Sequence, residues 1–160
     1  MLQSANSEQV PKASTFSVTV SSRGIDFVQE IAAGTHHILG DEPIEDGGAD
    51  AGPSPYELLL AALGTCKSIT VSMYAKTKAW PLERVVVRLA HSKVHAEDCR
   101  DCHTKEGMLD RIECELEFEG PLSAEQRARL LEIASHCPVH RTLTSEISIL
   151  SRLAMAEAAR

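Results

Sequence analysis

Two of the five cysteines in this 160-residue chain stand where their types and neighbours could support thiol chemistry. Cys66 ends an apolar run that starts at Tyr56, and Cys137 comes directly before Pro138. A thiol in an apolar helix stripe is most often a small core residue and reacts slowly unless a cation stabilises the thiolate. Cys137 is placed differently, because the N–H groups and positive dipole at the start of a following helix would favour a thiolate. The spacing of the two cysteines does not show whether they meet, so a redox pair and two core residues both stay open.

The segment CRDC, from Cys99 to Cys102, is the second thiol signal. With His103 directly after it, Cys99 and Cys102 could supply part of a tetrahedral zinc shell, so zinc is a candidate cofactor at these three residues. A single C-x-x-C without a second pair is a weak signal, and a reversible disulfide or an ordinary polar loop are the alternatives. Cys114 alternates with apolar residues and is predicted to be a core residue.

The elements that must position these thiols follow from hydrophobic periodicity. A long helix is expected from Tyr56 to Lys78 and is stopped by Pro81. A capping box at 123–126 opens a second helix, and Pro138 starts a short third one. Within the long helix one apolar stripe is predicted, formed by Leu58, Ala62, Cys66, Ile69 and Met73 and widened by Leu59, Leu63 and Thr70, so that the helix is buried on more than one side. Strands are expected at residues 15–20, 25–31, 35–43, 84–91, 110–120 and 146–150. Strands flanking helices in this order indicate an α+β domain.

Domain organisation is predicted from length and from the character of the two ends. We expect one domain at 15–153, a disordered tail at 1–14 and a frayed C-terminus at 154–160, because 160 residues suit a single core. The polar N-terminus has no secretory pattern and no apolar run reaches the roughly 20 residues of a membrane span, so we expect a cytoplasmic protein without a membrane partner.

Composition excludes several functions. The net charge of −7 and the pI of about 5.5 argue against binding of nucleic acid. The chain has no Gly-rich phosphate loop and no G-x-S-x-G elbow, so nucleotide-binding and serine-hydrolase chemistry lack their motifs.

Two runs of the sequence resemble the OsmC/Ohr family of osmotically induced and organic-hydroperoxide-resistance proteins. They are GGADAGPSPYELLLAALGTCKSITVSMYA and the later LLEIASHCPVHRTLTSEI. The likeness extends roughly from Phe16 to Leu150, and the CRDC segment looks like a branch within the family. It implies an OsmC-like α+β fold, with antiparallel sheets wrapped around two long central helices in an intertwined homodimer.

The resemblance also implies roles for individual residues. Cys66 would be the peroxidatic nucleophile and Cys137 the resolving cysteine. The activating glutamate of the family would stand ten residues before the nucleophile, where this chain has Tyr56, and Glu57 is the carboxylate one step along. The activating arginine comes from the first hairpin, which makes Arg23 the match by position.

A thiol peroxidase of organic hydroperoxides is therefore the expected activity, with a dithiol reductant as partner and no cofactor required. The substrate's carbon chain would lie against the apolar helix run, at Tyr56, Leu59, Leu63 and Ile69. The alternative is a non-catalytic dimer of the same fold that binds an apolar small molecule, with a structural zinc at Cys99 and Cys102.

Overall fold

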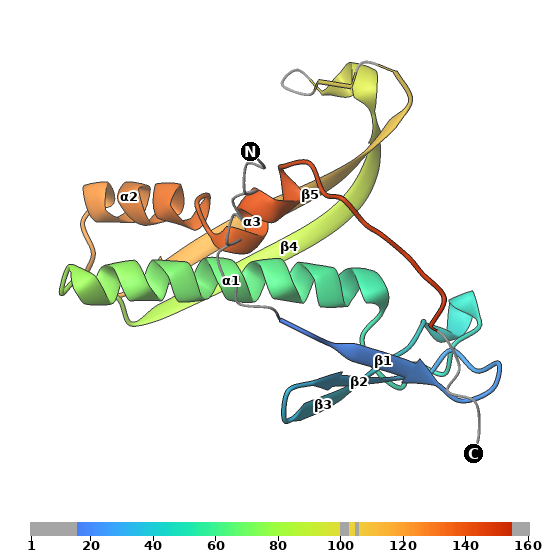
Figure 1. The fold of residues 1–160 in the computed structure, drawn as a ribbon. Helices are drawn as coiled ribbons and strands as arrows, with labels where there is room; N and C mark the ends of the chain where they lie inside the picture. Colours follow the sequence, from blue (N-terminus) through green and yellow to red (C-terminus); the bar gives the residue numbers. More distant parts are fainter. Residues whose placement is uncertain (1–15, 100–102, 105, 155–160) are drawn as a thin grey trace, which may run out of the picture. The chain divides into compact units, whose positions relative to one another are not determined.

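The computed structural model describes residues 16–99, 103–104 and 106–154. Along the chain come three strands, a long helix, two further strands and two shorter helices (Figure 1). The contacts divide the chain into two compact units, Met1–Pro55 and Tyr56–Arg160. The fold is α+β with antiparallel sheets and one long helix, as the sequence predicts. The predicted tail at 1–14 and almost all of the C-terminal stretch at 154–160 lie outside the described residues.

The N-terminal unit is built on a three-stranded antiparallel sheet. β1 (Thr19–Ser22), β2 (Gln29–Ala33) and β3 (His36–Gly40) pair in sequence order. Gly34, with a φ of +62°, makes the tight turn between β2 and β3. The second strand starts later than predicted, because residues 23–28 form the connection between β1 and β2.

The loop after β3 is organised by one buried carboxylate. Asp41 is only 3% exposed and accepts hydrogen bonds from the backbone N–H groups of Glu42, Ala49 and Ala51 at 2.8–3.0 Å. The bond from Ala51 does most to lower the pKa of Asp41, because it stabilises the charged form. This carboxylate therefore ties both ends of the loop around the short 3₁₀ turn Ile44–Asp46.

The long helix α1 (Pro55–Thr77) has 23 residues, with proline at its start, Glu57 in its first turn and Lys76 in its last. These charges suit the helix dipole at each end. The helix is long and apolar enough to cross a membrane by length and composition alone, with a mean hydropathy of 1.4. It lies instead within the C-terminal unit, where Leu63, Val71 and Ala75 are buried.

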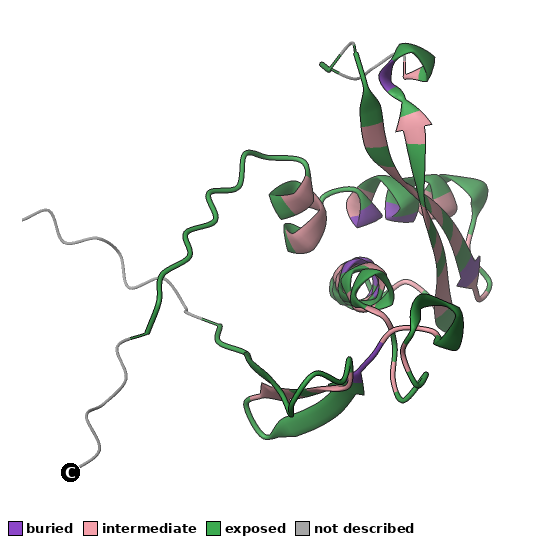
Figure 2. Ribbon diagram, turned by 90° about the vertical axis from the view of Figure 1, so that its right-hand side faces the viewer, coloured by how far each residue is buried: buried purple, intermediate pink, exposed green. Residues whose placement is uncertain are grey.

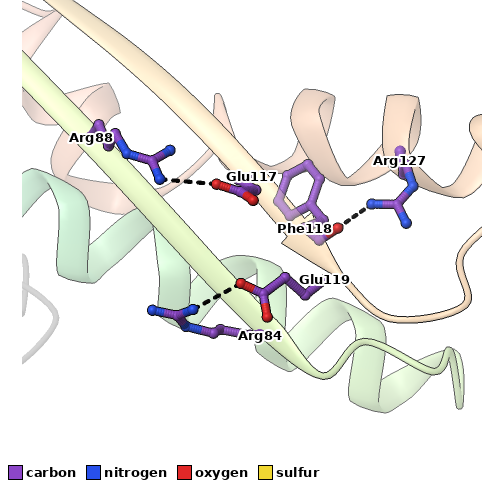
Figure 3. Close-up of polar contacts among 6 residues, drawn as sticks. All are labelled: Arg84, Arg88, Glu117, Phe118, Glu119 and Arg127. Carbon is purple, nitrogen blue, oxygen red and sulfur yellow. Dashed lines mark hydrogen bonds and ion pairs between the residues drawn. The ribbon is translucent and has the colours of Figure 1, made fainter.

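Two 12-residue strands, β4 (Arg84–His95) and β5 (Met108–Glu119), form a long antiparallel hairpin paired along its whole length. β4 runs four residues beyond the predicted strand. Arg84 pairs with Glu119 at 2.9 Å and Arg88 with Glu117 at 3.0 Å on the hairpin surface (Figure 3). The glutamates of β5 alternate with its apolar residues and lie on a solvated face, as the sequence indicates.

Two shorter helices complete the C-terminal unit. α2 (Ala124–Ala134) opens with the predicted capping box between Ser123 and Gln126. Arg127 on this helix donates to the carbonyl oxygen of Phe118 (Figure 3). It also donates to the carbonyl oxygen of Gly120 and so fixes the end of β5. α3 (Pro138–Leu143) follows with proline in its first turn. The strand predicted at 146–150 is wrong, because residues 146–154 have no regular secondary structure.

The core of this unit lies where α1, α2 and the hairpin face one another (Figure 2). It is formed by Val71, Ala75, Phe118, Leu130 and Ala134. A Cβ atom at Gly64 would lie 2.8 Å from Leu89 on β4, so this glycine permits the close approach of α1 to the hairpin. The approach sets which face of α1 is buried, and with it the position of Cys66 two residues later.

Candidate active site

The structure brings Cys66 and Cys137 together. Cys66 lies in the middle of α1, and Cys137 is the N-cap residue of α3. The Cys66 sulfur accepts a hydrogen bond from the Val139 N–H at 3.4 Å, and the Cys137 sulfur accepts one from the His140 N–H at 3.4 Å. The two side chains also hydrogen-bond to each other, and both cysteines are free thiols. The first turn of α3 thus presents two backbone donors to two adjacent sulfurs.

The surroundings of Cys137 keep it protonated. Cys137 is fully buried, and this burial raises the pKa of its thiol. The hydrogen bond and the charge of the Cys66 sulfur raise that pKa further, whereas the His140 N–H and the positive charge of Lys67 lower it. A thiol that stays protonated beside a second sulfur suits a resolving role, because it attacks only after its neighbour has been oxidised.

Lys67 is a site residue that the sequence analysis missed. Its side chain is only 3% exposed, although lysine is almost never buried without a partner. Its Nζ donates to the Ala134 carbonyl oxygen at 3.2 Å and lies 3.4 Å from Nδ1 of His140. Burial, the Lys67 charge and His136 together lower the pKa of His140, in that order. The lowered pKa favours a neutral His140 imidazole near pH 7, whose Nδ1 accepts a hydrogen bond from the Lys67 ammonium.

The buried face of α1 includes Leu63 of the predicted stripe but not its C-terminal members. Ile69 and Met73 are 54% and 65% exposed, and the buried row runs through Leu63, Lys67 and Val71. The signal in the sequence was the four-residue spacing from Leu63 to Lys67, Val71 and Ala75, which places a lysine in an apolar row.

A cavity of about 390 Å³ opens beside Lys67 and His140. Its walls come from α1, β5, α2 and α3, and they include Leu63, Cys114 and Leu131. Of the residues predicted to bind substrate, Leu63 lines this cavity. Ile69 lines a second hollow of about 380 Å³ between α1 and β4. Leu59 is 37% exposed on α1.

Tyr56, the fourth of these residues, stacks on His91 of β4 with ring centroids 4.4 Å apart. Nε2 of His91 lies 2.9 Å from the Asp110 carboxylate, to which Lys93 also donates at 3.0 Å. Hydrogen bonds from His91 and Lys93 lower the pKa of Asp110. Tyr56 is thus held by the hairpin at the first turn of α1.

The two predicted activating residues lie in different units. Glu57 belongs to the first turn of α1 and is exposed. Arg23 follows β1 in the N-terminal unit and forms an ion pair with Glu30 at 3.2 Å. Arg23 belongs to Met1–Pro55 and Cys66 to Tyr56–Arg160, and an approach of the two stays a prediction.

The predicted zinc site falls only partly on described residues. Cys99 is disulfide-bonded, so its sulfur is not a thiolate ligand in this state. His103 is exposed, and Cys102 lies outside the described residues. Within the described part of the chain no group of three or more His, Cys, Asp or Glu side chains is arranged to hold a metal ion. Zinc at Cys99, Cys102 and His103 therefore stays a prediction.

Comparison with known proteins gives one family and many similar structures. A family model described as OsmC-like protein matches residues 47–151. A search of curated proteins gave no match. An OsmC-like protein from Mycoplasma pneumoniae is 20% identical, with a TM-score of 0.63 over 82% of this chain and 88% of that one.

Two further solved structures share the fold. A protein from Psychrobacter arcticus, described as a putative osmotic stress induced and detoxification response protein, is 16% identical, with a TM-score of 0.63 over 83% of this chain and 91% of that one. The organic hydroperoxide resistance protein OhrB of Bacillus subtilis is 16% identical, with a TM-score of 0.56 over 81% and 90% of the two chains.

Proposed function

This chain belongs to the OsmC-like family, and on that premise we propose that it is a thiol peroxidase that reduces organic hydroperoxides through Cys66 and Cys137. The family includes organic hydroperoxide resistance proteins, and this supports a redox or stress-response role. The observation that carries the proposal is the contact between the two free thiols at the first turn of α3.

The reaction follows from this arrangement in three steps. The Cys66 thiolate attacks one oxygen of the peroxide, the O–O bond breaks, and the departing alkoxide takes up a proton to leave as an alcohol. The resulting Cys66 sulfenic acid is then attacked by the sulfur of Cys137. A disulfide forms and one water molecule leaves. A dithiol reductant reopens the disulfide and is itself oxidised to a disulfide.

The other predicted residues take supporting roles in this proposal. Arg23 and Glu57 are proposed to activate Cys66, while Tyr56, Leu59, Leu63 and Ile69 are proposed to contact the carbon chain of the peroxide. The apolar side chains of Leu63 and Ile69 line hollows on two sides of α1, and such surfaces suit an alkyl group.

Homodimer formation is part of the same proposal. Large apolar side chains stay exposed on α1 and in the C-terminal segment, namely Leu59, Ile69, Met73, Ile147, Ile149, Leu150 and Leu153. Such a set is more than a monomer usually leaves in water, and a partner subunit would bury it. Light scattering behind size-exclusion chromatography should give the mass of two chains. We place the protein in the cytoplasm, where a dithiol reductant keeps such thiols reduced.

The test is to add one equivalent of cumene hydroperoxide to the reduced protein and follow both peroxide loss and free thiols. Peptide mass spectrometry should then find Cys66 linked to Cys137. C66S should consume no peroxide, and C137S should accumulate a sulfenic acid that dimedone traps. C114S is the thiol control, because Cys114 is a free thiol on β5, and it should still form the Cys66–Cys137 disulfide.

The alternative function is binding of an apolar small molecule without catalysis, and the cavity of about 390 Å³ is the observation that favours it. Full recovery of the peroxide after incubation, together with a ligand retained in native mass spectrometry, would decide for binding and against the peroxidase.

A further inference from the structure

We propose that Lys67 is the built-in cation that stabilises negative charge on the Cys66–Cys137 sulfur pair. This role deepens the peroxidase proposed above, and its consequence for peroxide reduction rests on that function. It assigns the activating charge to the C-terminal unit itself, in addition to the role proposed for Arg23. Because Lys67 acts through the sulfurs, it is a positioning residue in this mechanism.

The first argument is the free-energy cost of burying the ammonium group of Lys67. A buried ammonium loses its hydration, and that loss is repaid only by hydrogen bonds and by nearby negative charge. The Ala134 carbonyl and Nδ1 of His140 accept two of its three protons. Both acceptors are neutral, so the hydrogen bonds alone leave the positive charge uncompensated. A thiolate in the adjacent pair would supply the missing counter-charge.

The second argument is the set of groups that surround Lys67. From α3 come His140, whose Nδ1 lies 3.4 Å from the Lys67 Nζ, and Cys137, on whose thiol the Lys67 charge acts. Cys66 precedes Lys67 on α1 and interacts directly with Cys137. Asp110 and Cys114 line the same cavity from β5. The Asp110 carboxylate is already engaged by His91 and Lys93 and is more than half exposed, so solvent and these partners weaken its pull on Lys67. Among the described acidic neighbours of Lys67, Asp110 is already paired with His91 and Lys93, so the sulfur pair is left as the acidic group that Lys67 can compensate.

The third argument is the state of His140. Its lowered pKa favours the neutral ring near pH 7, so Lys67 and not His140 supplies the positive charge beside the sulfurs. With Nδ1 accepting from Lys67, the ring proton lies on Nε2. The His140 backbone N–H meanwhile donates to the Cys137 sulfur. His140 therefore holds both the cation and one of the two sulfurs, which fixes the geometry between them.

The experiment measures thiol ionisation directly and needs no peroxide. The reduced full-length protein is alkylated with iodoacetamide from pH 5 to 10, and peptide mass spectrometry follows Cys66, Cys137 and Cys114 separately. The variants are K67M, which removes charge and donors, K67Q, which keeps a donor without charge, and K67R, which keeps the charge. K76M is the matched control, because Lys76 lies exposed in the last turn of the same helix.

We expect K67M and K67Q to raise the pH midpoint of alkylation at the sulfur pair by about one unit, which is roughly a tenfold loss of thiolate at pH 7. K67R should restore most of the wild-type profile, and K76M should match it. The proposal would be overturned if the alkylation profile of K67Q matched the wild type at both cysteines. It would also be overturned if the midpoint of K67R shifted as far as that of K67M. Circular dichroism melts of each variant check folding, and K67Q against K67R decides the question if K67M does not fold.

The outcomes separate this proposal from the peroxidase itself. A shifted alkylation profile in a protein that consumes no peroxide would support Lys67 and refute the enzyme. Normal peroxide turnover with an unshifted profile would support the enzyme and refute Lys67.

Discussion

Formation of the Cys66–Cys137 disulfide should raise the free energy of unfolding of the protein by about 2–4 kcal/mol. The bond would close a loop of about 70 residues, for which the loss of chain entropy in the unfolded state gives roughly 4 kcal/mol at 25 °C. Cys66 and Cys137 already touch and are held by donors from adjacent residues of α3. Little backbone movement is therefore needed, and most of the entropic gain should survive.

Part of this gain is lost because oxidation changes the sulfur contacts. The hydrogen bond between the two sulfurs disappears, and a disulfide sulfur is a weaker acceptor for the Val139 and His140 N–H groups than a thiolate is. Each neutral hydrogen bond contributes about 0.5–1.5 kcal/mol, which explains the lower end of the expected range.

Urea denaturation of the reduced and the peroxide-treated protein measures the effect. Trp80 is the single tryptophan and packs against the core, so its fluorescence reports the unfolding of the C-terminal unit. With a urea slope of about 2 kcal/mol per molar, the midpoint should rise by about 1–2 M. C137S retains Cys99 and its disulfide but lacks the resolving thiol, so its midpoint should rise by much less than that of the wild type. Equal rises in the two proteins would show that the stabilising bond is not the Cys66–Cys137 disulfide.

Three further perturbations test the fold and the electrostatics around the site. Leu130 is fully buried, so L130A should lower the free energy of unfolding by about 2–5 kcal/mol in the same assay, whereas L150A, at an exposed position, should change it little in the monomer. D41A leaves three backbone N–H groups without their acceptor, so amide hydrogen exchange should become faster at Glu42, Ala49 and Ala51. Because the pKa of Asp41 is lowered, its carboxylate stabilises the fold above about pH 4, and this stabilisation is lost as the pH falls further. Because the pKa of His140 is lowered in the folded protein, the unfolded chain binds more protons than the folded one below about pH 6.5. The free energy of unfolding should therefore fall as the pH drops through that value, and H140Q should make its dependence on pH flatter in this range.

Local signals in the sequence predicted well where α2 and α3 begin. The capping box at Ser123, the proline at the start of α3 and the position of Cys137 before it each involve residues a few positions apart. Interactions of this range are decided by backbone hydrogen bonding within one turn, so the sequence contains them directly.

The buried face of α1 could not be predicted in the same way. Residues 58–63 are all apolar, so several helix faces satisfy the periodicity equally well. The choice between them is made by the close approach at Gly64 and Leu89, which joins residues of two different elements. Lys67 was missed for this reason, because it becomes a buried residue only once that face is known.

The predicted strand at 146–150 failed for a related reason. Alternation of apolar and polar side chains shows that a segment can pair, but a strand also needs a neighbour with free backbone groups. Within the described residues of this chain no strand pairs with Ile147 or Ile149, and both side chains are exposed. In the proposed homodimer, a strand of the second subunit is the neighbour that this segment would need.

The choice of cap residue at α3 argues for chemistry at Cys137 independently of any family. The first turn of a helix has N–H groups that need acceptors, and serine, threonine, aspartate or asparagine supply them best. This chain uses Ser123 for that purpose at α2 but uses Cys137 at α3, although sulfur is a weak acceptor. C137S should therefore cap α3 at least as well as the native residue. Because the cysteine brings no advantage as a cap, its presence is better explained by reaction of its sulfur with Cys66. If so, C137S should lose disulfide formation but keep the stability of the reduced wild-type protein.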